Sequence, residues 1–216
     1  MICRLRIALL VFLAAAPVMH AGQLLDRIVA TVDSRIIAES EWEEAVRVEC
    51  LLEGRPVEQI GAADRQATLQ RLIDQALLQQ QMENTGFEPA TSEDVAERLR
   101  NVRERLPQGQ DDAAWHALLA RYGLTEDTLR QRLALQLDLE RYIDQRFRST
   151  VYVEPAAVEA YYRDQLAPQL QAKNAPVPSL AEVRERIERL LTEQRVNELV
   201  ASWLKALRTQ TEIQVR

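Results

Sequence analysis

The hydrophobic pattern begins with a period of two and soon changes to a period near 3.6. Residues 28–32, IVATV, alternate as a strand does. Asp33 and Ser34 suit a tight turn, and residues 35–38, RIIA, predict the return strand. An isolated hairpin is marginal in water and gains from a third strand. Residues 212–215 carry the best unused strand pattern, so we predict that they complete this sheet.

Most of the remaining pattern predicts helices. We expect them at about residues 40–52, 63–85, 91–106, 111–122, 125–147, 155–167 and 179–208. Ser40 with Glu43, and Ser179 with Glu182, have the spacing of capping boxes. Residues 168–179, with three prolines, predict a loop. The fold class is therefore mostly α, with a small sheet formed by the N-terminal hairpin and the C-terminal strand.

The helix at 125–147 carries an unusually wide apolar surface. Its large apolar side chains cover an arc of about 220°, at 100° per residue. An ordinary surface helix needs an apolar stripe of about 100° or somewhat more. This helix is therefore either the centre of a bundle, covered on two sides, or one wall of a groove left open for a partner.

The apolar stripe of the last helix changes sides along its length. Val183 and Ile187 lie on one face, whereas Val196 and Leu207 lie roughly opposite. No Pro or Gly offers a break, so we expect an unkinked helix that bridges two packing environments.

Composition and motifs exclude several function classes. The 216 residues have a net charge of −6, which argues against nucleic acid as a partner. The mature chain retains Cys50, which we expect to be a buried apolar residue. We find no zinc-ligand spacing and no phosphate-binding glycine motif. We therefore expect no metal, no cofactor and no catalytic residues.

The first residues have the order of a secretion signal. Arg4 and Arg6 precede an apolar run, and small residues up to Ala21 follow it. The run of about 13 residues is shorter than the roughly 20 that span a bilayer. We predict a signal peptide over residues 1–21 and no stable membrane insertion after its cleavage. The alternative is an uncleaved signal that anchors the protein.

Three segments occur in an order typical of one family: DRIVATVDSRIIAESE, then VYVEPAAVEAYYRDQ after several helices, and finally ASWLKALRTQTEIQV. With the export signal, this order resembles the SurA-type periplasmic chaperones and related foldases. The resemblance covers about residues 24–216. It implies a periplasmic chaperone module whose last strand returns to the N-terminal hairpin.

The chain departs from this family at one place. Parvulin-type prolyl isomerase domains usually separate the YY helix from the returning helix, but Tyr162 and Ser179 are only 17 positions apart. We therefore expect no isomerase domain and no enzymatic activity. The expected organisation is a helical chaperone module with its hairpin at 22–150, a helix and proline-containing loop at 151–178, and the returning helix and strand at 179–216.

The resemblance favours an ATP-independent holdase for unfolded or nascent envelope proteins during outer membrane protein assembly. The outer-membrane assembly machinery is a further candidate partner. The alternatives are an envelope scaffold with one fixed partner and a degenerate peptidyl-prolyl isomerase. Candidate client-binding residues are Met82, Phe87, Trp115, Tyr122, Leu135, Leu139, Tyr142, Tyr161 and Tyr162. Core packing is the alternative role for each aromatic residue among them.

Overall fold

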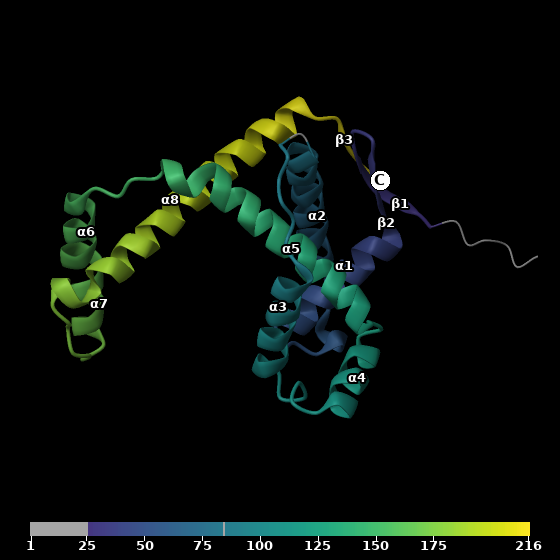
Figure 1. The fold of residues 1–216 in the computed structure, drawn as a ribbon, viewed down its shortest axis with the longest axis horizontal. Coiled ribbons are helices and arrows are strands. Elements are labelled where there is room, and N and C mark those ends of the chain that lie inside the picture. The colour runs from purple at the N-terminus through teal and green to yellow at the C-terminus, as the bar shows by residue number, and fades with distance from the viewer. Residues whose placement is uncertain (1–25, 84) are drawn as a thin grey trace, which may run out of the picture.

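The computed structural model describes residues 26–83 and 85–216 (Figure 1). The expected signal peptide at residues 1–21 lies outside the described residues, so that prediction remains a prediction. Within the described part of the chain, no helix is both long enough and apolar enough to cross a membrane.

Helices make up most of the structure, as the sequence predicts. The first half runs through β1 (Ile28–Val32), β2 (Arg35–Ala38), α1 (Glu39–Leu52), α2 (Ala62–Glu83), α3 (Ser92–Arg105), α4 (Asp112–Arg121) and α5 (Glu126–Phe147). The second half runs through α6 (Pro155–Tyr161), a π-helical segment (Tyr162–Leu166), α7 (Ala167–Ala172), α8 (Leu180–Gln210) and β3 (Ile213–Val215). Short 3₁₀ turns occur at Val57–Gln59 and Arg148–Thr150.

The three strands form one antiparallel sheet in the order β2-β1-β3. Val32 in the central strand pairs with Arg35 on one side and Ile213 on the other. Asp33 adopts a φ of 48° in the turn between β1 and β2, in the left-handed region that Asp tolerates better than most residues. The sheet confirms that the C-terminal strand completes the N-terminal hairpin.

Two hydrophobic cores meet along α1. The first lies between the sheet, α1, α2 and the C-terminal end of α8, where Val32, Ile73 and Leu207 are buried. The second lies between α1, α3, α4 and α5, and it contains Leu51, Trp115 and Leu129. Figure 1 shows the resulting body, with α5 crossing between α3 and α8.

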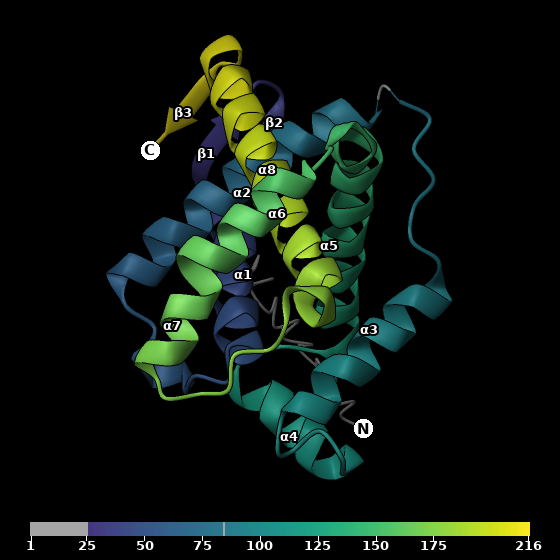
Figure 2. The same ribbon diagram turned by 90° about the vertical axis from the view of Figure 1, so that its left-hand side faces the viewer.

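A helical arm projects from this body. We use "the arm" for α6, the π-helical segment, α7 and the N-terminal half of α8, which pack around buried Val158, Val183 and Ile187. Figures 1 and 2 show α8 running unbroken from the arm to the sheet. Its 31 residues confirm the prediction of a bridging helix, because its first stripe packs in the arm and its second in the body.

Two local predictions are wrong. Helix α1 begins at Glu39, so Ser40 lies inside its first turn and does not form a capping box with Glu43. The Ser40 amide and hydroxyl instead donate to the carboxylate of Asp26. In the arm, residues 168–172 are helical and not part of the loop, because the π-helical segment continues the α6 axis into α7.

Candidate functional site

The wide apolar surface of α5 is only partly covered. Leu129 and Leu133 are buried in the core with α3 and α4, whereas Leu139 and Tyr142 are buried elsewhere along the helix. Leu135 is only half-buried. Helix α5 is therefore covered by its neighbours near Leu129, Leu133, Leu139 and Tyr142, and it borders a hollow around Leu135.

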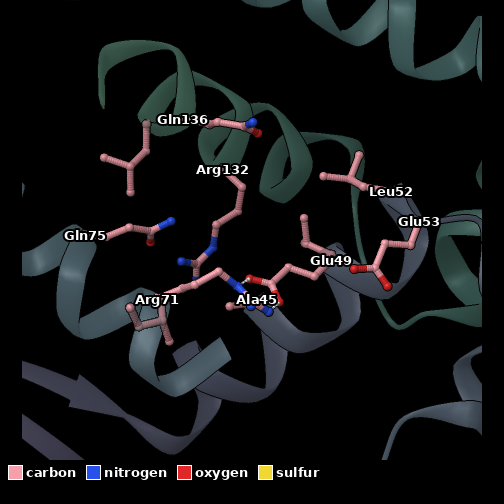
Figure 3. Close-up of a pocket in the computed structure, with 11 residues that line it drawn as sticks. Ala45, Glu49, Leu52, Glu53, Arg71, Gln75, Arg132 and Gln136 are labelled. Atoms are coloured by element: carbon pink, nitrogen blue, oxygen red, sulfur yellow. Dashed lines mark hydrogen bonds and ion pairs between the residues drawn. The ribbon is translucent and has the colours of Figure 1, made fainter. Parts of the chain in front are cut away.

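That hollow lies between α1, α2 and α5 and has a volume of about 460 Å³. Ala45, Val48, Leu72 and Leu135 give it an apolar lining, while charged and amide side chains surround it. Figure 3 shows Arg132 extending from α5 across the hollow towards the side occupied by Arg71 and Ala45.

Two neighbouring hollows share residues with the central one. Leu135 also lines a space of about 310 Å³ beside Met82 and Phe87, at the end of α2. Leu52 and Gln136 also line a space of about 180 Å³ between α1, α3 and α5. We call these three linked hollows the α5 groove. It follows α5 and touches α1, α2 and α3 along its length.

Ion pairs hold the charged rim of the groove. The Arg71 Nε donates to Glu49 Oε1 at 2.8 Å, and this hydrogen bond raises the pKa of Arg71. Arg132 joins α5 to α1, with 3.0 Å between its Nη2 and Glu44 Oε1. The groove therefore combines an apolar lining with fixed charges at its edge, an arrangement that keeps exposed apolar surface soluble.

The structure places three predicted site residues together in this groove. Met82 and Phe87 line one end, and Leu135 joins that end to the central hollow. All three side chains are half-buried, so part of each remains accessible.

Four other candidates are buried and cannot form an accessible surface in this conformation. Trp115 is fully buried and donates from Nε1 to Glu126 Oε2 at 2.9 Å. Tyr122 is buried with its hydroxyl 2.6 Å from the carbonyl oxygen of Arg55. Leu139 and Tyr142 are also buried. Core packing, the alternative role for the aromatic residues, holds for Trp115, Tyr122 and Tyr142.

The last two candidates belong to the arm. Tyr161 and Tyr162 are half-buried and pack against the core formed by Val158, Val183 and Ile187. The Tyr162 hydroxyl donates to the carbonyl oxygen of Pro178 at 2.8 Å. These two residues therefore lie apart from the α5 groove and not in one surface with Met82 and Leu135.

Sequence reasoning missed the polar residues of the groove. Arg132 and Gln136 both line it, and both fall inside the apolar arc of α5 at 100° per residue. Polar side chains inside an apolar arc indicate that this part of the helix faces an open space. Leu52, Glu49 and Arg71 give no comparable signal, because α1 and α2 come together only in the folded structure.

The described residues offer little for catalysis. They contain no group of three or more His, Cys, Asp or Glu side chains that could hold a metal ion. Cys50 is buried, and desolvation raises the pKa of its thiol. A raised pKa lowers the fraction of reactive thiolate.

A family model matches residues 2–143 and describes a SurA-like N-terminal domain. The match includes β1, β2, helices α1 to α4 and α5 as far as Ile143, and therefore the groove-forming part of the body. No curated protein matches the chain. The family is periplasmic, and its N-terminal domain is a non-catalytic chaperone module that binds unfolded proteins. The chain belongs to the family of SurA-like N-terminal domains.

Proposed function

We propose that this protein is an ATP-independent periplasmic holdase that binds unfolded or nascent envelope proteins, outer-membrane proteins among them, in the α5 groove. The observation that carries the proposal is the row of three neighbouring hollows along α5, which share lining residues and have apolar side chains inside and ion pairs at the rim. The sequence has no phosphate-binding motif, which supports a role without ATP.

The chemistry of the groove suits many different clients. Apolar contact is non-directional, so it favours any extended segment with large apolar side chains. Met82 at one end adds an unbranched side chain that adapts to different shapes. Arg71, Arg98 and Arg132 at the rim are each paired with a carboxylate of the protein itself, which reduces the demand for one particular charge pattern in the client.

Export to the periplasm through the predicted signal is part of this proposal, with the outer-membrane assembly machinery as a further partner. Catalysis is not part of it. Residues 162–179, where the family usually carries an isomerase domain, form the π-helical segment, α7 and a short loop. A proline-peptide isomerisation assay checks this point, and clear catalysis would restore the enzyme hypothesis.

The experiment measures light scattering from several unrelated unfolded proteins as they aggregate, with and without the protein. We expect suppression for most clients. Leu135→Asp introduces a charge into the middle of the groove and should weaken client binding about tenfold, since roughly 1.4 kcal/mol of lost apolar contact corresponds to that factor. The matched control is Ile36→Asp, at an apolar residue on the sheet that is 49% exposed.

The possible results lead to different conclusions. Equal activity of the Leu135→Asp and wild-type proteins would remove the groove from the mechanism. Suppression of no client at all would contradict the holdase and leave the scaffold with one fixed partner as the better hypothesis.

A further inference from the structure

A second apolar hollow, of about 260 Å³, lies in the arm. The π-helical segment builds one of its walls. Residues five apart in an α-helix point about 140° away from each other, whereas the i→i+5 bonding of a π-helix brings them closer to one face. Tyr161 and Leu166 are five apart, and both line this hollow. Insertions of this kind are frequent at functional sites.

The opposite wall is held in place by hydrogen bonds. The Tyr162 hydroxyl donates to the carbonyl oxygen of Pro178 at 2.8 Å. Ser179 and Glu182 then form the predicted capping box, with the Ser179 amide 2.7 Å from Glu182 Oε2. Buried Ile187 lies behind, while Leu190, at the edge, is 39% exposed. The hollow is therefore preformed.

Among the described residues, one cation at this hollow has no carboxylate within 4.0 Å. Arg163, Arg184 and Arg189 in the arm each have a carboxylate within 4.0 Å. Arg186 lines the hollow, and no carboxylate among the described residues pairs with it. An apolar hollow with an unpaired guanidinium beside it is complementary to an apolar group that has a carboxylate nearby.

The size of the hollow limits its occupant. Sites for small molecules usually have about 300–1,000 Å³, and this space is smaller. We propose that it binds one large apolar side chain of a partner polypeptide that carries an Asp or Glu close to that side chain. We call it the arm pocket. It is separate from the α5 groove and lies outside the part of the chain that the family model matches.

The experiment titrates the full chain with short Gly/Ser peptides that contain one Phe followed by Asp, with binding measured by isothermal titration calorimetry. Comparison peptides replace Asp by Asn or Lys, or Phe by Ala. We expect the Asp peptide to bind about three- to fivefold more tightly than the Asn peptide at low salt, as for an exposed ion pair, with the difference reduced at high salt. The Ala peptide should not bind.

Variants test the assignment of residues. Arg186→Glu should reverse the preference from the Asp peptide to the Lys peptide, and Leu190→Asp should abolish the Phe-dependent binding. Lys205→Glu makes the same charge change at an exposed position of α8 in the body, and it should leave every affinity unchanged. Circular dichroism verifies that the variants are folded.

Three results would overturn the proposal: no binding of any peptide, equal binding of the Phe and Ala peptides, or an unchanged preference in Arg186→Glu. Aggregation suppression by Leu190→Asp should equal that of the wild type. A fall in suppression would show that the arm pocket is part of the client-binding surface, and it would contradict a separate site. The Leu135→Asp variant tests the holdase function independently.

Discussion

Asp33 and Glu212 exchange two hydrogen bonds across the sheet. The Asp33 amide donates to the Glu212 carbonyl oxygen at 2.9 Å, and the Glu212 amide donates to Asp33 Oδ1 at 3.0 Å. One turn residue thus anchors the start of β3 beside β1, although 179 positions separate the two residues.

Deletion of residues 211–216 should therefore destabilise the body. It removes these hydrogen bonds, the pairing of β1 with β3, and Ile213, which packs against the first core. We expect a loss of about 3 kcal/mol in the free energy of unfolding, from typical values for apolar burial and hydrogen bonds. Urea denaturation measures this loss of stability. An unchanged denaturation midpoint would show that the pairing of β3 with β1 does not stabilise the body.

A milder test changes Asp33 alone. Asp33→Gly keeps the positive φ accessible but removes the carboxylate, so the loss should be about 1 kcal/mol. Asp33→Asn is the matched control, because Asn also tolerates this conformation and retains a side-chain oxygen acceptor. Equal stability of the Gly and Asn variants would show that the hydrogen bond to the Glu212 amide contributes nothing.

The closure of the sheet could be predicted because a strand pattern without a partner is conspicuous in a helical chain. The burial of Trp115 and Tyr122 could not, since their polar atoms find partners that are 11 and 67 positions away in the sequence. Burial of these side chains is favourable once their polar atoms are hydrogen-bonded. The pattern of apolar and polar residues along the sequence does not show which distant residues will form these hydrogen bonds.

The α5 groove was predictable in kind but not in detail. The 22-residue α5 has more apolar surface than one stripe needs, which indicated either a second covered side or a groove. The structure shows buried residues of this arc at Leu129, Leu133 and Leu139, and a hollow that the same arc borders around Leu135. The capping box predicted at Ser40 does not form for another reason. Asp26, which lies outside the helix, accepts the hydrogen bond from the Ser40 amide that Glu43 would accept in a capping box.

Arg208 joins the end of α8 to α2. Its Nε donates to Asp74 Oδ1 at 2.8 Å, and its two terminal nitrogens donate to the side chain and the backbone of Gln70. Arg208→Lys cannot reproduce this fork and should cost about 1–2 kcal/mol, measured by chemical denaturation. Lys205→Ala on the same helix, at an exposed position, should change stability by less than about 0.5 kcal/mol.

Trp203 joins α8 to α5 through aromatic and cationic contacts. Its ring lies 5.4 Å from the Phe147 ring, with the Arg146 guanidinium 4.3 Å above it. Trp203→Ala should cost about 3 kcal/mol through lost packing, whereas Arg146→Ala should cost about 0.5–1 kcal/mol. Thermal denaturation compares the two variants, and equal losses would show that the cation and not the packing dominates.

The start of α3 predicts a pH effect. The carboxylate of Asp94 accepts hydrogen bonds from Thr91 and pairs with Arg141, and these contacts lower its pKa to about 2. A folded-state pKa below the unfolded value of 3.8 stabilises the protein above pH 3.8, and this contribution is lost as the pH falls towards 2. Asp94→Asn should therefore reduce the acid dependence of stability between about pH 4 and pH 2. Urea midpoints across this range measure the difference, and identical slopes would contradict it.

The continuous helix α8 makes the folding of the arm depend on the body, but not the reverse. The body has two large cores of its own, whereas the arm relies on a small cluster around Val158 and on the helical state of α8. Regions with few buried apolar contacts open at lower free energy than the global unfolding. We therefore expect the arm to open as a separate cooperative unit, and amide hydrogens near Ile187 should exchange with solvent faster than those near Leu207. The arm of such a protein can unfold locally while the three-stranded sheet stays folded.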